Sequence, residues 1–434
     1  MNRTLVFLIS AAALAAQTRP PATPAAPKPA APKPAATKPA APAPARAGAV
    51  PSYKDLKFPT LRPIQVPKID TSTLPNGIRL YLLEDHELPL VNGTALVRTG
   101  NLFDPREKVG VALLAGMVMR TGGTKAKTGD ELNEQLENIA ASVETAIDES
   151  FGSVTFSALK PNAAEVLAVF KDVLSSPEFR QDKLDLAKNQ LRSVISRRND
   201  NPGGIAQREF QDTVYGKETP YGWEEEYATL DRIGREDLLG FYRRYFFQKN
   251  LVLAVSGDFD TAEMKPQIEK AFSDWTVTQP PVPDFPKVGP EPKGATLLAV
   301  KNDVTQTFFA IGQRGGEIRD KDYPALAIMA NILGGGFQSR LFRKVRTEMG
   351  NAYEIGATWS ARYDHPGVFE ISGSTKSLST VDTIKAIREE VDRIRTTEVT
   401  EAELKTAKDT ALNSFVFAFD TRAKTLGRLL SYEY

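Results

Sequence analysis

The sequence contains no cysteine and only two histidines, His86 and His365, in 434 residues. Without cysteine the chain can form neither disulfides nor thiolate metal sites, and it has no cysteine nucleophile. An excess of charge is also missing, because 55 basic and 54 acidic side chains nearly cancel. A near-neutral chain creates no bulk field that attracts nucleic acid or an anionic membrane. We therefore expect no nucleic-acid partner, and a globular chain of two or three domains.

The N-terminus has the pattern of an export signal. Arg3 precedes the apolar run Leu5–Leu14, and Ala13 and Ala15 fit an A-x-A cleavage site. Because this run is too short to span a bilayer, we predict that residues 1–15 are a secretory signal peptide. Residues 16–51 are rich in Ala, Pro and Lys and should form an extended tether. No lipobox cysteine is present, so we expect a periplasmic or secreted protein without a membrane span after signal removal.

Strand and helix patterns alternate through a first domain, which we assign to residues 52–275. Alternating or apolar runs predict strands at 78–83, 90–100, 151–159 and 250–259. Helical periodicity predicts helices at 110–121, 128–140, 163–174 and 182–198. This order predicts an α+β fold, with a mostly antiparallel sheet and helices on one face.

The same order of elements returns after a proline-rich segment. Residues 276–294 contain six prolines, a density that excludes regular structure and predicts a linker. Residues 295–434 then repeat the succession of strand, glycine-containing turn, charged loop and apolar helix, followed by a strand at 367–373 and helices at 380–395 and from 400 onward. We interpret this as a duplicated fold with two homologous halves. The last predicted helix, 411–430, stops at SYEY, so the second half is expected to be short at its C-terminus.

Several short motifs, in order, resemble one peptidase family. They are TLPNGIRLYLLED, DNP (Asp200–Pro202), PYG (Pro220–Gly222), EDLLGFYRRYF, NLVLAVSGDF and GGGFQSRLFRKVRTEMGNAYEIGA. With the two halves and the linker, they make the chain similar to the pitrilysin or insulinase type of zinc metallopeptidases, the inverzincins. The resemblance runs from about Asp70 to the end of the chain.

The resemblance implies where a zinc site should lie, and the residues there cannot bind zinc. Aligning the family helix G-L-A-H-F-L-E-H on Gly110 puts the two histidine positions at Leu113 and Met117 and the general base at Gly116. The third ligand position falls at Ser193 or Val194. None of these residue types supplies the nitrogen or carboxylate ligands, or the base, that a catalytic zinc requires. His86 and His365 lie in predicted loops, where surface roles are expected for them.

The second half keeps the other part of the family's site. The family motif L-R-x-x-x-G-x-A-Y is matched by V-R-T-E-M-G-N-A-Y, with Arg346 and Tyr353 in the positions that hold the substrate backbone and its carbonyl oxygen. A guanidinium offers several fixed donors to carbonyl groups, and a phenol can donate to a developing oxyanion. Without the resemblance, the same residues would be interpreted as a cation at a helix C-terminus and an ordinary strand aromatic.

Three hypotheses follow for function. In the first, the chain is the non-catalytic, substrate-binding subunit of a heterodimeric zinc-dependent peptidase acting on peptides or small unfolded proteins; a zinc-bearing paralogue holds the metal and this chain supplies Arg346 and Tyr353. In the second, it is a structural or peptide-binding protein with no part in hydrolysis. A self-sufficient peptidase with a novel metal site is disfavoured by the missing ligands. We expect no cofactor in this chain.

Overall fold

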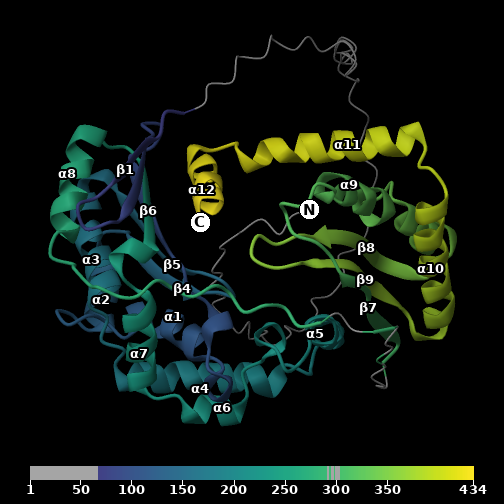
Figure 1. Ribbon diagram of the computed structural model, residues 1–434, viewed down its shortest axis with the longest axis horizontal. Helices are drawn as coiled ribbons and strands as arrows, with labels where there is room; N and C mark the ends of the chain where they lie inside the picture. The colour runs from purple at the N-terminus through teal and green to yellow at the C-terminus, as the bar shows by residue number, and fades with distance from the viewer. Residues whose placement is uncertain (1–66, 291–292, 295–297, 299–303) are drawn as a thin grey trace, which may run out of the picture. The chain divides into compact units, whose positions relative to one another are not determined.

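The computed structural model describes residues 67–290, 293–294, 298 and 304–434; the predicted signal peptide (1–15) and tether (16–51) lie outside the described residues. The first half is built on a six-stranded sheet in the order β1-β2-β6-β3-β5-β4 (Figure 1). Only β2 and β6 pair in parallel, which confirms the predicted mostly antiparallel α+β class. The strands are β1 (Asp70–Thr73), β2 (Arg79–Glu84), β3 (Leu90–Val97), β4 (Ser142–Ile147), β5 (Gly152–Leu159) and β6 (Leu251–Gly257).

Eight α-helices accompany this sheet within the described residues: α1 (Val111–Thr121), α2 (Gly129–Asn138), α3 (Ala163–Ser175), α4 (Gln181–Arg197), α5 (Pro202–Tyr215), α6 (Tyr227–Arg232), α7 (Arg235–Tyr245) and α8 (Thr261–Phe272). The sequence analysis predicted α1 to α4 but not β1, β4 or α5 to α8. Local capping explains where some of them begin: Thr128 and Glu131 form a capping box at α2, each bonding the other's backbone N–H.

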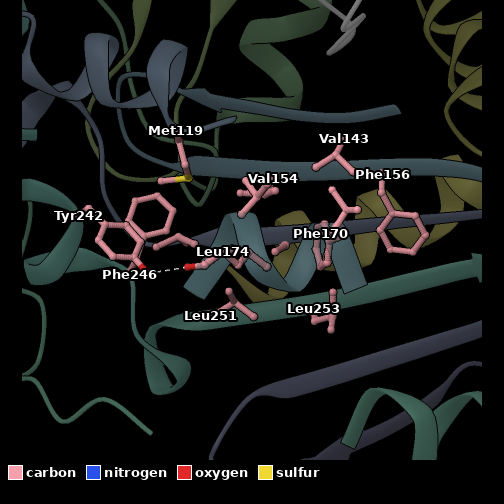
Figure 2. Packing of buried hydrophobic residues seen from close by; sticks show 14 of the residues in the cluster. Met119, Val143, Val154, Phe156, Phe170, Leu174, Tyr242, Phe246, Leu251 and Leu253 are labelled. Carbon is pink, nitrogen blue, oxygen red and sulfur yellow. Dashed lines mark hydrogen bonds between the residues drawn. The ribbon is translucent and has the colours of Figure 1, made fainter. Parts of the chain in front are cut away.

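The main core lies between the sheet and its helices. Figure 2 shows Val154, Phe156, Leu251 and Leu253 from the strands packed with Phe170 and Leu174 of α3. The Tyr242 hydroxyl donates to the Leu174 carbonyl over 2.8 Å, so the one polar atom that this ring buries is satisfied.

The second half has a smaller sheet with the same connectivity. Its strands β7 (Gln306–Arg314), β8 (Ala352–Ser360) and β9 (Val368–Lys376) form an antiparallel sheet in the order β7-β9-β8, as β3, β4 and β5 do in the order β3-β5-β4. Helix α9 (Tyr323–Gly334) connects β7 to β8, and α10 (Thr380–Thr396) and α11 (Glu401–Phe415) follow β9. The repeated order is that of a duplicated fold. Within the described residues no strand lies beside β7 in the way that β6 lies beside β3.

The last helix differs from the sequence prediction. The predicted helix 411–430 is interrupted: α11 ends at Phe415, and α12 (Arg422–Glu433) begins only after Thr421, whose side chain accepts from the Lys424 N–H. The break lets α12 turn back toward β6 (Figure 1). Leu426 and Leu430 pack there with Val252 and Ala254, on the sheet face opposite the main core. Every residue of β6 is therefore buried.

The two halves meet through α5 and the strands β7 and β9. The Arg314 guanidinium donates to the carbonyls of Val214 and Gly289, over 2.9 and 2.8 Å. The Tyr215 hydroxyl donates to the Pro366 carbonyl over 2.9 Å. The described part of the proline-rich segment, 276–290 and 293–294, has no regular secondary structure. None of the helices in the described residues combines the length and apolarity needed to cross a membrane.

Candidate functional site

Helix α1, which carries the implied histidine and base positions, is anchored at its first turn by a buried carboxylate. Asp104 accepts hydrogen bonds from the backbone N–H groups of Gly110 and Ala112, over 2.7 and 3.0 Å. Gly110 itself has a φ of 104°, a conformation that favours glycine. Burial raises the pKa of Asp104 to about 7, and the nearby Glu225 carboxylate adds to that effect against the lowering by the backbone donors. The sequence analysis missed Asp104.

The general-base position is closed by packing. Gly116 faces β4 so closely that a Cβ atom built on it would lie 2.5 Å from the backbone nitrogen of Ile147. The Thr145 hydroxyl also donates to the Gly116 carbonyl over 2.7 Å, which fixes the helix against the strand. A glutamate at this position could not fit without moving α1 or β4. The structure therefore excludes the side chain that the family motif places here.

The other implied zinc positions are on α1 and α4, two helices that contact each other. Met117 packs against the main core, and Val194 is 64% exposed. The Ser193 hydroxyl donates to the Asn189 carbonyl of its own helix over 3.0 Å. With Leu113 also apolar, these residues do not fit a zinc ion, since none offers a nitrogen or carboxylate ligand. Within the described part of the chain, no three His, Asp or Glu side chains are grouped to hold a metal ion.

The two histidines have different surroundings. His86 is exposed and its Nδ1 lies 2.7 Å from Asp258, as expected for a surface residue. The surface role expected for His365 is wrong, because its side chain is only 3% exposed. Its Nδ1 lies 3.0 Å from Asp364, and its ring packs on Tyr215 and Tyr221 at 5.6 and 4.5 Å between centroids. His365 thus belongs to the contact between the halves, which a local turn pattern does not reveal.

Arg346 and Tyr353 lie together. The Arg346 guanidinium carbon is 4.8 Å from the centre of the Tyr353 ring and 4.6 Å from that of Phe342. Arg346 belongs to a π-helical turn, Phe342–Glu348, whose wider spacing differs from an ordinary helix end. Tyr353 is the second residue of β8 and is 77% exposed. The seven-residue separation spans the turn at Gly350, where φ is 63°.

The segment just before this pair is fixed by a buried ion pair. Nε and Nη2 of Arg340 donate to the two carboxylate oxygens of Glu403, over 2.7 and 2.9 Å, and the Arg340 side chain is 3% exposed. Hydrogen bonding by Arg340 is the main cause that lowers the pKa of Glu403 to about 2. This bidentate pair ties the start of the Arg346 segment to the N-terminus of α11.

Phe337 and Phe342 extend the Arg346–Tyr353 pair, and the sequence analysis missed both. Their rings meet edge to face, with centroids 4.9 Å apart, and Phe337 is 76% exposed. The spacing of Phe342 four residues before Arg346 was the available signal, because such residues share a helix face. No hydrogen bond, ion pair or ring contact links Arg346 or Tyr353 to the implied zinc positions within the described residues.

Comparison with known proteins assigns the family. The family model described as insulinase, peptidase family M16, matches residues 82–221, and the model described as the peptidase M16 inactive domain matches residues 232–411. The chain belongs to the insulinase family. Both halves named in the sequence analysis are thus covered, and the resemblance on which that analysis depended is confirmed.

Relatives within the insulinase family differ in what their names claim. An uncharacterized zinc protease of Rickettsia bellii is 25% identical over 313 residues, which cover 70% of this chain and 73% of that protein. The non-peptidase homolog YmxG of Helicobacter pylori is 24% identical over 361 residues, 81% of each chain. A probable mitochondrial-processing peptidase subunit beta of Arabidopsis thaliana is 23% identical over 410 residues, 88% of this chain and 76% of that protein.

Solved structures share the fold. The crystal structure of a peptidase M16 inactive domain from Pseudomonas fluorescens has a TM-score of 0.75 at 22% identity, covering 83% of this chain and 86% of that chain. A protease from Helicobacter pylori has a TM-score of 0.73 at 19% identity, covering 85% and 89%. These similarities establish the arrangement of strands and helices in this insulinase-family chain.

Proposed function

We propose that this chain is the non-catalytic, substrate-binding subunit of a heterodimeric zinc-dependent peptidase that acts on peptides or small unfolded proteins. It supplies Arg346 and Tyr353 in trans to a zinc-bearing paralogue. The observation that carries the proposal is the asymmetry of the chain: Arg346 and Tyr353 are kept and in contact, whereas a glycine packed against β4 stands at the base position. A chain selected only as a scaffold has no need for the first of these features.

The chemistry of the pair suits a peptide backbone. A guanidinium can donate several hydrogen bonds to carbonyl oxygens, and the exposed Tyr353 hydroxyl can donate one to an oxyanion that forms at the scissile carbonyl. The names of the relatives support the division of labour, since they include zinc proteases, a non-peptidase homolog and a subunit of a processing peptidase. In this proposal zinc is held by the partner, and the chain alone binds none and cleaves no peptide.

Reconstitution with the zinc-bearing partner tests the proposal. We expect Tyr353→Phe to reduce turnover about a hundredfold, the typical cost of losing one oxyanion donor, and Arg346→Ala to weaken substrate binding as well. Tyr432→Phe is the matched control, because Tyr432 is another exposed tyrosine, on α12. Assembly of each variant is checked first by size-exclusion chromatography.

The same experiment separates the alternative, a structural or peptide-binding protein. Full turnover in both Tyr353→Phe and Arg346→Ala complexes would assign the chain that role. One zinc per purified chain, with peptidase activity lost to a chelator, would contradict both hypotheses. A neighbouring reading frame that encodes an H-x-x-E-H paralogue would favour the first.

Export is part of the proposal. The Arg3 and Leu5–Leu14 pattern supports removal of residues 1–15 and a periplasmic or secreted location. The N-terminal sequence of the mature protein, read from a periplasmic extract, tests it: an intact Met1 on cytoplasmic protein would contradict export.

A further inference from the structure

Phe337 is an exposed aromatic residue that the local backbone holds in place. It follows three glycines, Gly334 to Gly336, and the last of them has a φ of 142°. The turn is closed behind it, because both the N–H and the hydroxyl of Ser339 donate to the Gly336 carbonyl, over 3.0 and 2.6 Å. The Phe337 ring contacts Phe342 edge to face. A large apolar side chain is therefore presented to solvent in a preorganised position.

The guanidinium beside it can be approached from only one direction. Phe342 and Tyr353 each place a ring within 5 Å of the Arg346 guanidinium carbon, at 4.6 and 4.8 Å. Within the described part of the chain its side chain makes no hydrogen bond or ion pair, whereas Arg340 in the same segment binds Glu403. The N–H donors of a guanidinium lie in its plane, so an acceptor must approach edge-on. A peptide carbonyl meets this requirement, and its flanking side chain then lies beside the Phe342 and Phe337 rings.

We propose that Phe337 and Phe342 form an apolar subsite, and that it accepts a large apolar side chain next to the carbonyl that Arg346 holds. The inference depends on the proposed role of Arg346 in peptide binding and adds the substrate class: peptides with an aromatic or large aliphatic residue at that position. An aromatic side chain buries a large apolar area and gains from ring-to-ring geometry, so it binds here more tightly than a small polar one.

The test uses the purified full chain and pairs of short capped peptides that differ only in carrying Phe or Ser at one position. Isothermal titration calorimetry gives the ratio of the two dissociation constants. We expect the Phe peptide to bind about tenfold more tightly, equivalent to about 1.4 kcal/mol. In Phe337→Ala this ratio should fall to about twofold or less, and Phe337→Leu should restore most of it.

Phe417→Ala is the matched control, because Phe417 is also a largely exposed phenylalanine, at 66%, outside the Arg346 segment. The control should keep the tenfold ratio. Arg346→Ala should weaken both peptides by a similar factor, which distinguishes loss of backbone binding from loss of selectivity. Thermal unfolding of each variant confirms that it is folded.

An unchanged ratio in Phe337→Ala would overturn the subsite, and the proposed function would still stand if Tyr353→Phe lowers turnover in the reconstituted complex. Equal affinity of the wild type for the two peptides would overturn the subsite in the same way. Failure of either peptide to bind at millimolar concentration would contradict the subsite too. Full turnover of the Arg346 and Tyr353 variants, with the Phe preference still abolished by Phe337→Ala, would instead reject the catalytic role and leave a peptide-binding protein with this selectivity.

Discussion

The ion pair between Arg340 and Glu403 gives a stability prediction with a magnitude that follows from the structure. We consider the substitution Glu403→Gln, which removes the charge and keeps the shape. Glutamine resembles the protonated form of glutamate, so the predicted cost equals the difference in stability between the two forms of Glu403. The pKa is lowered from 4.5 to about 2, and this difference corresponds to about 3 kcal/mol.

The surroundings make a loss of this size physically reasonable. The Arg340 side chain is 3% exposed, so its charge cannot regain water when Glu403 becomes neutral. Glu403 also accepts from the Thr400 N–H over 2.9 Å, and a glutamine can keep that bond. Glu390 lies near enough to Arg340 to act on it electrostatically, so part of the compensation remains. The loss is therefore expected near 3 kcal/mol and not above 5 kcal/mol.

Urea unfolding followed by circular dichroism measures the change in the free energy of unfolding. Glu401→Gln is the control, because it removes an exposed carboxylate from the same first turn of α11 and should cost about 0.5 kcal/mol. Arg340→Met combined with Glu403→Gln should recover part of the loss, giving a coupling energy above about 1 kcal/mol.

The pH dependence follows from the same pKa. Because the folded value of Glu403 is lower than the unfolded one, its contribution is present above about pH 4.5 and is lost as the pH falls toward 2. A cost below about 1 kcal/mol for Glu403→Gln at pH 7, or additive single and double variants, would refute this account of the pair.

Three further predictions concern other parts of the fold. Burial raises the pKa of Asp104 from 3.8 to about 7, so this group should lower stability by up to about 4 kcal/mol as the pH rises from about 4 to 7, and Asp104→Asn should flatten that slope in thermal unfolding. Gly116→Glu should cost about 3 kcal/mol and create no zinc site, because its Cβ meets β4, whereas Gly240→Glu, where nothing lies within 4 Å, should cost about 1 kcal/mol or less; zinc binding by the first variant would be against the packing argument. His365→Ala should cost about 2 kcal/mol in urea unfolding, since it empties a position enclosed by Tyr215 and Tyr221, and a change below about 0.5 kcal/mol would mean that His365 is not part of the contact between the halves.

The sequence by itself determined the features that depend on residue type and local spacing. Apolar periodicity located α1 to α4, and the repeated order of elements indicated two halves, because one helix or strand face is encoded within a few residues. Loss of the zinc ligands was also a matter of residue type at Leu113 and Met117. The intact spacing of Arg346 and Tyr353 named the candidate pair, and the structure places the two in contact.

Only the tertiary structure decided what depends on segments distant in the chain. Gly116 is closed by β4, some 30 residues later, and the turn that predicted a surface role for His365 is buried by α5 of the other half. Phe337 is a lone phenylalanine after glycines until its ring is seen against Phe342, beside the uncovered edge of a guanidinium. Such contacts are fixed by packing between elements, and neither composition nor periodicity records which elements meet.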